Sequence, residues 1–376
     1  MTNVTRLLVN RANFHQTEFE HTELEALQEQ QVRLTIASFS LTANNITYAA
    51  AGDMMRYWEF FPASDGMGVI PVWGFADVTA SRCDELATGE RIYGYFPMAT
   101  HLTVTPGRIT AGSFIDTSPH RQSLPVIYNQ YLRCSHDPLY TRENEHLQML
   151  LRPLFTTSFL LDDFMAENHF FDAEELLLTS ASSKTALGMA YCLKQNRARR
   201  SNDYKIIGIT SPGNREFVSG LGCYDQVICY NEIENISHQK KTVTVDFAGN
   251  GKVLQALHQR LAPNQQYSCL VGASHWDQRA SDKKSWTGPA PVLFFAPTQA
   301  QKRIGEWGAA QFQRNVAESW APFIEFVNGW MNVEMFYGPS AVVDIYHKLL
   351  SGQFPPSSGY ILSLQDSAGG SPAFLY

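Results

Sequence analysis

Hydroxyl and ammonium side chains are concentrated in one short segment of the chain, Ser180-Ala181-Ser182-Ser183-Lys184-Thr185. The segment follows Glu175 to Thr179, an apolar run of the length expected for a buried strand, and from Thr185 the apolar residues take a helical spacing. Free N–H groups and the dipole at a helix N-terminus favour an anion. Ser180, Ser182, Ser183, Lys184 and Thr185 are therefore predicted to bind a pyrophosphate. The alternative is an ordinary turn, capped by serine, that binds nothing.

A second group of polar side chains follows the next apolar run, Ile206 to Ile209. Thr210, Ser211, Asn214 and Arg215 stand there, and no acidic residue does. An acid at this place would hold a ribose 2′-hydroxyl, whereas an arginine accommodates a 2′-phosphate. The segment favours NADP over NAD, unless Arg215 is only a solvated charge on the first turn of a helix.

The elements that would position these groups alternate between strand and helix, which predicts a doubly wound parallel sheet. Ligands of such sheets bind beyond the carboxyl ends of the strands. Two further strand ends then become cofactor-binding candidates, Ala248 and Gly249 after residues 243–246, and Gly272 and Ser274 after residues 267–271. His275 is a candidate for the substrate pocket, because an imidazole titrates near neutral pH.

The order LLLTSASSKTALG, IIGITS, FVSGLGCYDQVICY, TVDFAGNG and CLVGASH is similar to the cofactor domain of medium-chain dehydrogenases/reductases. The resemblance is strongest to the zinc-independent quinone oxidoreductase and enoyl reductase branch, and the chain resembles a divergent member of it. It covers most of the chain but departs from the family at the phosphate turn, where serine and lysine replace glycines. The resemblance implies an α/β fold with a GroES-like β-barrel catalytic domain and a Rossmann cofactor domain. It also implies NADP(H) as cofactor and a homodimer.

The length of 376 residues exceeds the size at which one core keeps growing, so more than one domain is expected. Residues 31–110 contain short apolar runs separated by turn residues, as in an all-β domain. The predicted boundaries are 1–150 for the GroES-like domain, 151–300 for the Rossmann domain, and 301–376 for a C-terminal return that completes the first domain.

The resemblance also places a short helix in the segment Leu41 to Asp53, next to the nicotinamide and the substrate. Ala43 stands at the position of a zinc-binding cysteine and Phe75 at that of a histidine ligand, and neither side chain can bind zinc. The candidates for catalysis are then the polar residues of this segment, Asn45, Thr47 and Tyr48. An amide or phenol can donate to a developing oxyanion without a metal. The alternative is that Asn45 caps the helix and Tyr48 only packs on it.

The segment after this helix is rich in aromatic residues and methionine. Tyr57 and Trp58 are predicted to line an apolar substrate pocket, with Tyr128 and Asn129 as second-rank candidates. A local hydrophobic core is the alternative and the commoner fate of such residues.

Composition excludes several classes of protein. The net charge of −7 argues against nucleic-acid binding, which needs a basic surface. The six cysteines form no CxxC pair, so no zinc ribbon or thioredoxin-like site is expected. We also expect no membrane span, because no apolar run is long enough, and a cytoplasmic location, because the N-terminal segment does not resemble a signal peptide.

These features lead to one functional hypothesis and one alternative. The first is an NADPH-dependent, zinc-independent oxidoreductase that transfers hydride to an activated alkene (an enone, quinone or enoyl thioester) or to a carbonyl in a small-molecule substrate. The alternative is a non-catalytic sensor or scaffold that binds a dinucleotide, because the altered phosphate turn affects the groups that would hold the cofactor.

Overall fold

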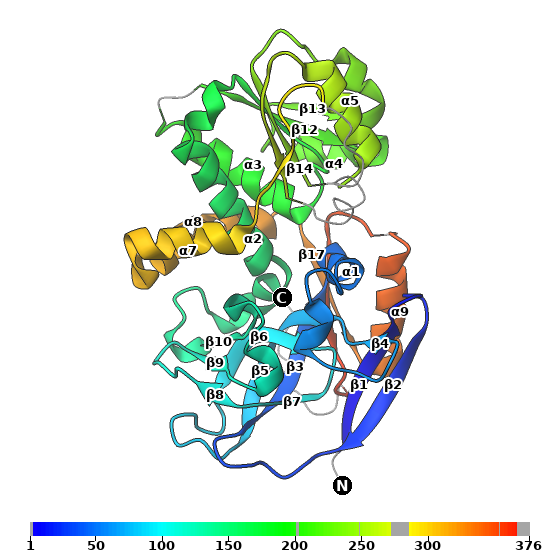
Figure 1. Cartoon of the computed structure of the whole chain (residues 1–376), viewed down its shortest axis with the longest axis vertical. Helices are drawn as coiled ribbons and strands as arrows, with labels where there is room; N and C mark the ends of the chain where they lie inside the picture. The colour runs from blue at the N-terminus through cyan, green and yellow to red at the C-terminus, as the bar shows by residue number, and fades with distance from the viewer. Residues whose placement is uncertain (1–2, 201–202, 248, 272–285, 353, 367–376) are drawn as a thin grey trace. The chain divides into compact units, whose positions relative to one another are not determined.

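The computed structural model describes residues 3–200, 203–247, 249–271, 286–352 and 354–366 (Figure 1). The chain forms two compact units. The first unit contains residues 1–150 and 331–376, and the second contains residues 151–330. The division thus assigns residues 301–330 to the second unit, whereas the sequence analysis assigned them to the C-terminal return.

The first unit is built mainly from antiparallel strands. Its strands are β1 (Asn3–Asn10), β2 (Thr17–Glu23), β3 (Val32–Leu41), β4 (Met67–Gly68), β5 (Pro71–Ser81), β6 (Arg91–Pro97), β7 (His101–Val104), β8 (Pro106–Gly107), β9 (Ser113–Asp116), β10 (Gln130–Arg133), β17 (Asn332–Tyr337) and β18 (Ser358–Ser363). Its helical segments include α1 (Ala43–Ala50), η1 (Tyr57–Phe60), η2 (Pro119–Arg121), η3 (Val126–Tyr128) and α9 (Pro339–Leu350). The expected short helix before Asp53 is therefore confirmed as α1.

Two sheets make up this unit. The smaller has the order β2-β1-β4, and the larger has the order β17-β18-β3-β5-β6-β10-β9-β8, with β7 also paired to β3. Strand β18 pairs antiparallel with β3, so residues 358–363 join the sheet formed by the N-terminal half of the unit. The C-terminal segment thus returns to the first unit, because its apolar strand completes that sheet.

Strands β5 and β6 present an aromatic face to the candidate substrate groups. Their register pairs Trp73 with Tyr95 and Phe75 with Tyr93. Since side chains two residues apart on a strand share a face, these four rings lie on the same side of the sheet. Trp73 and Tyr93 stack, with ring centroids 5.6 Å apart.

Helix α2 (Glu145–Glu167) continues through Pro153. A proline inside a helix has no N–H to bond the carbonyl four residues earlier, here that of Met149. The Ser40 hydroxyl donates to that carbonyl at 2.7 Å. A side chain of β3 thus satisfies the carbonyl that Pro153 leaves without a helical partner.

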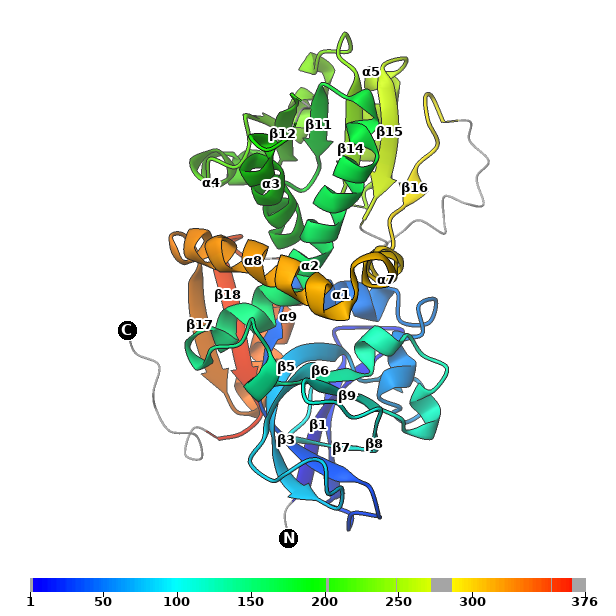
Figure 2. The same ribbon diagram turned by 90° about the vertical axis from the view of Figure 1, so that its left-hand side faces the viewer.

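The second unit holds a parallel sheet with helices on both faces. Its strands are β11 (Glu175–Leu178), β12 (Lys205–Thr210), β13 (Gln226–Cys229), β14 (Thr242–Asp246), β15 (Gln265–Leu270) and β16 (Val292–Leu293). Its helical segments include α3 (Lys184–Arg197), η7 (Pro212–Asn214), α4 (Arg215–Gly220), η8 (Tyr230–Asn235), α5 (Gly251–Leu261), α7 (Ala296–Trp307) and α8 (Ala309–Asn328). Figures 1 and 2 show α3 on one side of this sheet and α5 on the other.

The strand order of this sheet is β13-β12-β11-β14-β15-β16. Counted from its first strand, this is the order 3-2-1-4-5-6 of a dinucleotide-binding doubly wound fold. The chain changes direction across the sheet between β11 and β14, which is where such folds bind their ligand. The predicted α/β class and Rossmann arrangement are confirmed.

Helix α8 packs within the second unit through aromatic contacts. Phe323 stacks on Phe155 of α2 at 4.4 Å, and Phe326 stacks on Tyr191 of α3 at 5.0 Å. These contacts explain why residues beyond 300 belong to this unit.

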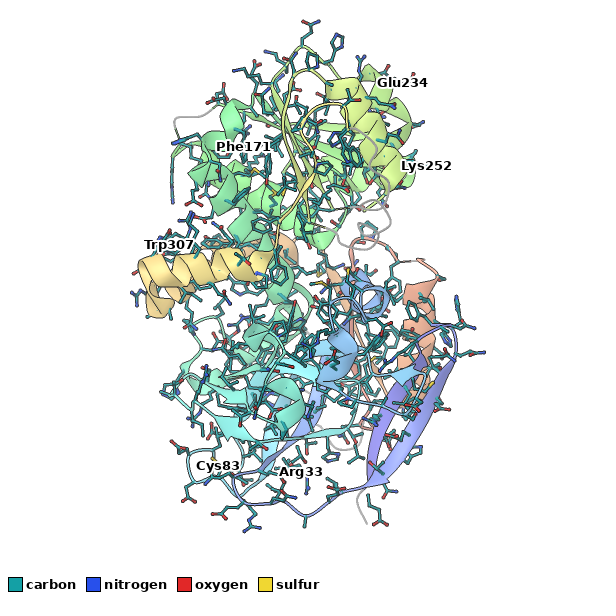
Figure 3. The ribbon with its side chains drawn as sticks, viewed as in Figure 1. Arg33, Cys83, Phe171, Glu234, Lys252 and Trp307 are labelled. Carbon is teal, nitrogen blue, oxygen red and sulfur yellow. The ribbon has the colours of Figure 1, made fainter. Side chains whose placement is uncertain are left out.

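Each of the six cysteines is buried, and no disulfide is formed in the described part of the chain; Cys83 is labelled in Figure 3. Burial raises the pKa of the Cys192 and Cys269 thiols. Both thiols are therefore protonated at neutral pH and serve as small apolar side chains. No helix within the described ranges is long and apolar enough to span a membrane.

Candidate functional site

The predicted phosphate turn connects β11 to α3 in the second unit. Ser180 has a φ of 50°, in the left-handed region that glycine usually occupies, and the Ser183 N–H donates to the Ser180 carbonyl at 2.7 Å. Ser183 is the N-cap of α3, because its hydroxyl oxygen accepts the Ala186 N–H at 3.3 Å. The turn therefore reaches the geometry of a glycine turn without glycine, and α3 begins at the next residue, Lys184.

The hydroxyl groups of Ser182 and Ser183 each retain a proton that they can donate to a ligand. Ser182 accepts a hydrogen bond from the Asn214 amide nitrogen at 3.0 Å. A serine hydroxyl has one proton and two lone pairs, so a hydroxyl that accepts from nitrogen still has its own proton to donate. The same reasoning applies to Ser183. Asn214, predicted as a separate cofactor contact, thus lies beside the turn.

Lys184 provides the cationic group of the turn. Its side chain is partly buried, and burial lowers the pKa of the ammonium to about 8. The group therefore remains charged at neutral pH and becomes neutral above about pH 8. Thr185, the next residue, is partly buried, and its carbonyl accepts the Ser158 hydroxyl of α2 at 2.7 Å.

Three residues that the sequence analysis missed support the turn. The Tyr230 hydroxyl accepts the Ser180 N–H at 2.9 Å, and the Tyr224 hydroxyl donates to the Ala181 carbonyl at 2.9 Å. Gly208 lets both the turn and Tyr224 approach β12, since a Cβ there would lie 2.9 Å from the Ala181 Cβ and from the Tyr224 ring. A glycine inside an apolar strand is the sequence signal for such close approach.

The predicted 2′-phosphate contact, Arg215, is paired in the structure. Its guanidinium donates to both Glu232 carboxylate oxygens, at 3.0 and 3.1 Å. The Cys229 N–H, and then Arg215, hold the pKa of Glu232 below its usual range. The charge that Arg215 offers to a phosphate is thus reduced by Glu232. Of the other predicted contacts here, Thr210 is buried at the end of β12 and Ser211 is partly buried before η7.

The carboxyl end of β14 is held by a buried hydrogen bond between neighbouring strands. The Thr179 hydroxyl donates to Asp246 at 2.6 Å and accepts the Phe247 N–H at 2.9 Å. Gly249 follows with a φ of 64°, which a glycine adopts at little cost. The other predicted residues of these strand ends, Ala248, Gly272, Ser274 and His275, lie outside the described residues.

In the first unit, Asn45 belongs to the capping of α1. Its amide oxygen accepts the Thr42 N–H at 2.7 Å, and its amide nitrogen donates to the Pro71 carbonyl at 2.9 Å. Both ends of the amide are engaged, so these contacts favour the capping alternative. Thr47 is partly buried, and its hydroxyl lies 3.4 Å from the Ala43 carbonyl. Catalytic roles for Asn45 and Thr47 stay predictions.

Tyr48 is buried and accepts a hydrogen bond from Trp73. The Trp73 indole N–H donates to the Tyr48 oxygen at 3.1 Å. Burial raises the pKa of the Tyr48 hydroxyl, helped by Tyr57, while hydrogen bonds from Trp73 and Asn44 oppose the rise. Tyr48 is therefore neutral across the physiological pH range. Because an indole only donates, the phenolic proton of Tyr48 is not used by Trp73.

Three further tyrosines surround Tyr48 and, together with it, form what we call the tyrosine cluster: Tyr48, Tyr57, Tyr95 and Tyr128. The Tyr48 ring lies 4.7 Å from Tyr57 and 5.5 Å from Tyr95, and the Tyr57 and Tyr128 hydroxyls lie 3.3 Å apart. The Tyr95 hydroxyl is buried and has no hydrogen-bond partner in the described part of the chain. A buried hydroxyl without a partner is costly, so it is available to a bound polar group.

The structure does not bring the other two predicted pocket residues into the tyrosine cluster. Trp58 is buried against Gly52 and Gly68, where an added Cβ would lie 2.1 and 2.4 Å from its ring. Asn129 donates to the Arg121 carbonyl at 2.9 Å. Tyr95 belongs to the tyrosine cluster and Trp73 donates a hydrogen bond to it. The register of β5 and β6, which the sequence does not display, brings both residues there.

The two positions at which the resemblance places zinc ligands carry no donor atoms. Ala43 is the exposed first residue of α1. Phe75 is buried, with the Tyr93 ring at 5.1 Å and the Arg91 guanidinium at 5.3 Å. Within the described ranges, no group of three or more His, Cys, Asp or Glu side chains could hold a metal ion.

The β11–α3 turn fits a dinucleotide pyrophosphate by the chemistry of its donors. Ser182 and Ser183 present hydroxyl protons, Lys184 presents an ammonium, and all three lie at the N-terminus of a helix of 14 residues. One feature departs from a glycine-built turn, because the Ser180 N–H is already bonded to Tyr230. The side chains of this turn would thus replace part of the backbone donation that glycines permit.

The sequence matches one protein family over most of its length. That family is described as "Protein of unknown function (DUF2855)", and the match covers residues 39–355. The chain belongs to the DUF2855 family. No curated protein matches the DUF2855 chain.

Several solved structures share the fold of this DUF2855 protein. CurK enoyl reductase is 12% identical with a TM-score of 0.54, and a proposed NADPH:quinone reductase from Bacillus thuringiensis is 11% identical with a TM-score of 0.55. TarJ of S. aureus, solved with NADPH, is 11% identical with a TM-score of 0.51. Each match covers 96% of this chain and 99% of the other. The predicted fold, shared with an enoyl reductase and a proposed quinone reductase, is confirmed.

Proposed function

We propose that this protein is an NADPH-dependent, zinc-independent reductase that transfers hydride to an activated alkene or a carbonyl. The observation that carries the proposal is the hydrogen bond from Trp73 to Tyr48, which leaves a buried, neutral phenol with a proton to donate. A reduction of an enone, quinone or enoyl thioester develops negative charge on an oxygen. A donor placed at that oxygen stabilises the transition state.

Tyr48 is assigned the role of this donor. Its raised pKa keeps it protonated, and the bond from Trp73 polarises the O–H and fixes the direction of its lone pairs. Tyr95, whose buried hydroxyl has no partner in the described residues, would orient a second polar atom of the substrate. Asn45 is assigned a positioning role, because it holds the start of α1.

The turn between β11 and α3 is assigned to the cofactor. Ser182, Ser183 and Lys184 would hold the pyrophosphate, and Arg215 would contact a 2′-phosphate. NADPH, when bound, supplies the hydride. The strand order of the second unit supports this assignment, because dinucleotides bind at the point where the order reverses.

The solved structures support the same reaction class. They are an enoyl reductase, a proposed NADPH:quinone reductase and a protein in complex with NADPH. At 11–12% identity, these neighbours guide the choice of acceptors to test.

The test has a binding step and a turnover step. Nicotinamide fluorescence would be followed while the purified protein is titrated with NADPH and, separately, with NADH. NADPH oxidation would then be measured with enones, quinones and enoyl thioesters. We expect tighter binding of NADPH and turnover with at least one acceptor class. Absence of binding to both nucleotides would refute the proposal.

A second candidate function is a dinucleotide sensor or scaffold without catalysis. It is favoured by one observation, that Tyr230 already occupies the Ser180 N–H that a glycine turn would offer to phosphate. Binding of NADPH with no turnover of any acceptor would favour this candidate. In that case Tyr48→Phe would leave all measured properties unchanged.

Homodimer formation is part of the proposal. Among the described residues, strand β16 lies at one edge of the second sheet, and Val292 and Phe295 are 46% and 38% exposed. An unpaired strand edge with apolar side chains can pair with a second copy. Light scattering after gel filtration would give the mass in solution. We expect a dimer that Val292→Asp converts to a monomer, and a monomeric native protein would refute this part.

A further inference from the structure

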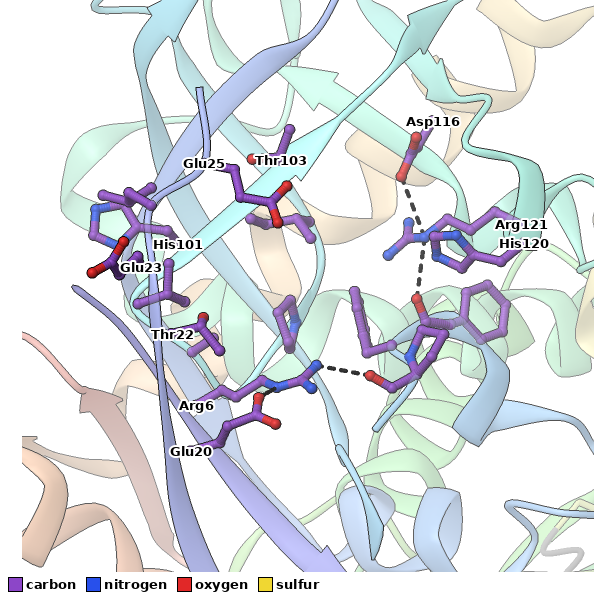
Figure 4. A pocket seen from close by; sticks show the side chains of 18 residues that line it. Arg6, Glu20, Thr22, Glu23, Glu25, His101, Thr103, Asp116, His120 and Arg121 are labelled. Carbon is purple, nitrogen blue, oxygen red and sulfur yellow. Dashed lines mark hydrogen bonds and ion pairs between the residues drawn. The ribbon is translucent and has the colours of Figure 1, made fainter. Parts of the chain in front are cut away.

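The first unit contains a cavity of about 380 Å³ that is separate from the tyrosine cluster. Its walls come from the β1–β2 hairpin, from β7 and from the segment of residues 116–121 (Figure 4). Phe60 and Phe61 line this cavity and also pack on Tyr95, with centroids 5.4 and 6.2 Å from its ring. The two phenylalanines thus separate the cavity from the proposed substrate groups.

One wall carries a buried ion pair with an unused donor. Arg121 is 1% exposed, and its Nε lies 3.3 Å from Asp116. Its Nη1 donates to the Tyr131 hydroxyl at 3.0 Å, and its Nε also lies 3.3 Å from the Phe60 carbonyl. Its Nη2 has no hydrogen-bond partner among the described residues. In Figure 4 the end of the Arg121 side chain points into the cavity.

A buried guanidinium with an unmatched N–H costs free energy. Asp116 does not relieve it, because the second carboxylate oxygen already accepts the Thr105 N–H at 3.1 Å and the Ser118 N–H and hydroxyl at 3.0 and 2.6 Å. The Arg121 cation is further fixed over the Phe61 ring, 4.6 Å from its centroid. An oxygen acceptor that enters the cavity would give Arg121 Nη2 the hydrogen-bond partner that it lacks.

The opposite wall is acidic. Arg6 already pairs with Glu20 and donates to the Pro62 carbonyl at 2.8 Å. Glu23 and Glu25 are exposed, and neither forms an ion pair in the described part of the chain. In Figure 4 the Glu25 carboxylate and the Arg121 guanidinium are drawn on opposite sides of the cavity.

The charges of the lining decide which ligands are disfavoured. The cations are Arg6 and Arg121, and the carboxylates are Glu20, Glu23, Glu25 and Asp116, so two positive charges face four negative ones. Burial, and then the charge of Arg33, lower the pKa of His101, which is therefore neutral at pH 7. A simple anion would meet net repulsion. A ligand with an ammonium group as well as an oxygen acceptor would not.

We propose that this cavity binds a small zwitterion, an amino acid or short peptide with an apolar side chain. The carboxylate accepts from Arg121 Nη2, and the ammonium lies near Glu25, on the opposite side of the cavity (Figure 4). The side chain packs on apolar residues that also line the cavity, Phe61, Pro97 and Leu102. The proposal does not depend on the reductase function, since none of these residues belongs to the tyrosine cluster or the β11–α3 turn.

Four related probes test the recognition of both ends. Binding of leucine, leucinamide, N-acetylleucine and 3-methylbutylamine to the full chain would be measured by NMR titration and by thermal shift. We expect leucine to bind best and leucinamide, which keeps a neutral carbonyl acceptor, more weakly. N-acetylleucine, which lacks the ammonium, and 3-methylbutylamine, which lacks any oxygen acceptor, should bind at least about fivefold more weakly than leucine. Equal binding of all four, or binding of none, would overturn the proposal.

Two variants assign the ends of the ligand. Glu25→Gln removes an exposed carboxylate, so folding is preserved, and we expect leucine affinity to fall by about threefold to fivefold. The matched control is Glu85→Gln, an exposed glutamate that does not line the cavity. Arg121→Lys keeps the charge beside Asp116 but removes Nη2, and it should lower leucine affinity by about tenfold while leaving 3-methylbutylamine unaffected. If Arg121→Lys does not fold, the Glu25→Gln result decides the proposal alone.

Discussion

The two candidate sites both offer hydrogen-bond donors to negative charge, but in different environments. The β11–α3 turn offers hydroxyls and an ammonium that are partly buried, whereas the tyrosine cluster offers phenols that are largely removed from water. A pyrophosphate carries its charge before and after binding, so a charged, partly solvated turn suits it. An oxyanion develops charge only during a reaction, so a neutral donor in a low-dielectric site suits it better. Under the proposed function, burial distinguishes the group that donates to the substrate from the groups that bind the cofactor more than residue type does.

The largest expected effect comes from the buried side of this comparison. Tyr48→Phe should lower kcat by about 100- to 1,000-fold, because it removes the proposed donor to the developing oxyanion. NADPH affinity should change by less than about twofold, since Tyr48 makes none of the contacts assigned to the cofactor. Steady-state kinetics and a fluorescence titration measure the two quantities.

The control for this variant is Tyr337→Phe, which removes an exposed hydroxyl on β17. An unchanged kcat in Tyr48→Phe would contradict a catalytic role for the tyrosine cluster, which would then serve only as hydrophobic core.

The next largest effect is expected at the β11–α3 turn. Lys184→Met should weaken NADPH binding by about 10- to 100-fold, because a charge-assisted contact to phosphate is lost. Since burial lowers the Lys184 pKa to about 8, the ammonium is present below that pH and lost above it. NADPH affinity of the native protein should therefore fall as the pH rises through about 8, and the variant should lack this dependence.

Fluorescence titrations between pH 6 and about pH 9.5 test this prediction. Lys252→Met is the control, since Lys252 is exposed at the start of α5 (labelled in Figure 3). A pH dependence that persists in Lys184→Met would assign the titration to another group.

A smaller effect is expected from the hydrogen bond between Trp73 and Tyr48. Trp73→Phe keeps an aromatic ring but removes the N–H that donates to Tyr48. We expect kcat to fall by about fivefold to tenfold with the KM for NADPH unchanged, because a neutral hydrogen bond contributes about that much. The 19F NMR shift of 3-fluorotyrosine at position 48 should also change in Trp73→Phe.

Trp307→Phe is the matched control for this change, since Trp307 lies in α7 of the second unit. A fluorine shift without a change in kcat would separate the hydrogen bond from the reaction and contradict the positioning role of Trp73.

The smallest effect concerns the ribose side of the cofactor. Glu232→Gln should increase NADPH affinity by about threefold relative to NADH, because it releases Arg215 from an exposed ion pair. Glu234→Gln, an exposed change on the same helical segment, should alter neither affinity. Titrations with both nucleotides give the ratio, and an unchanged ratio would argue that Arg215 does not face a 2′-phosphate.

Much of the second unit could be predicted from local sequence. The apolar runs at 175–179 and 206–209 are strands, and the serine-rich segment between the first strand and Ala186 caps a helix. These elements depend on local patterns of a few residues, which can be read without knowing the tertiary contacts. The continuation of helix α2 through Pro153 could not be predicted from local sequence. The Met149 carbonyl, which Pro153 cannot bond, accepts from Ser40, more than one hundred residues away in the chain.

The candidate sites were predicted less completely, for a related reason. The sequence identified Tyr48 and Tyr57, which are near each other in the chain, and it missed Tyr95 and Trp73, whose proximity depends on the register of β5 and β6. Trp58 was included because it neighbours Tyr57, yet adjacent residues point in different directions. Trp58 therefore packs against Gly52 and Gly68.

The sequence by itself determined the order of strands and helices, the polar character of the phosphate turn and the absence of donor atoms at Ala43 and Phe75. These follow from residue type and short-range periodicity. Only the tertiary structure decided which groups are paired and which remain available. Arg215 is joined to Glu232, while Tyr95 and Arg121 keep buried atoms that no described residue satisfies. Hydrogen bonding and burial depend on atoms from distant segments, and folding alone brings those atoms together.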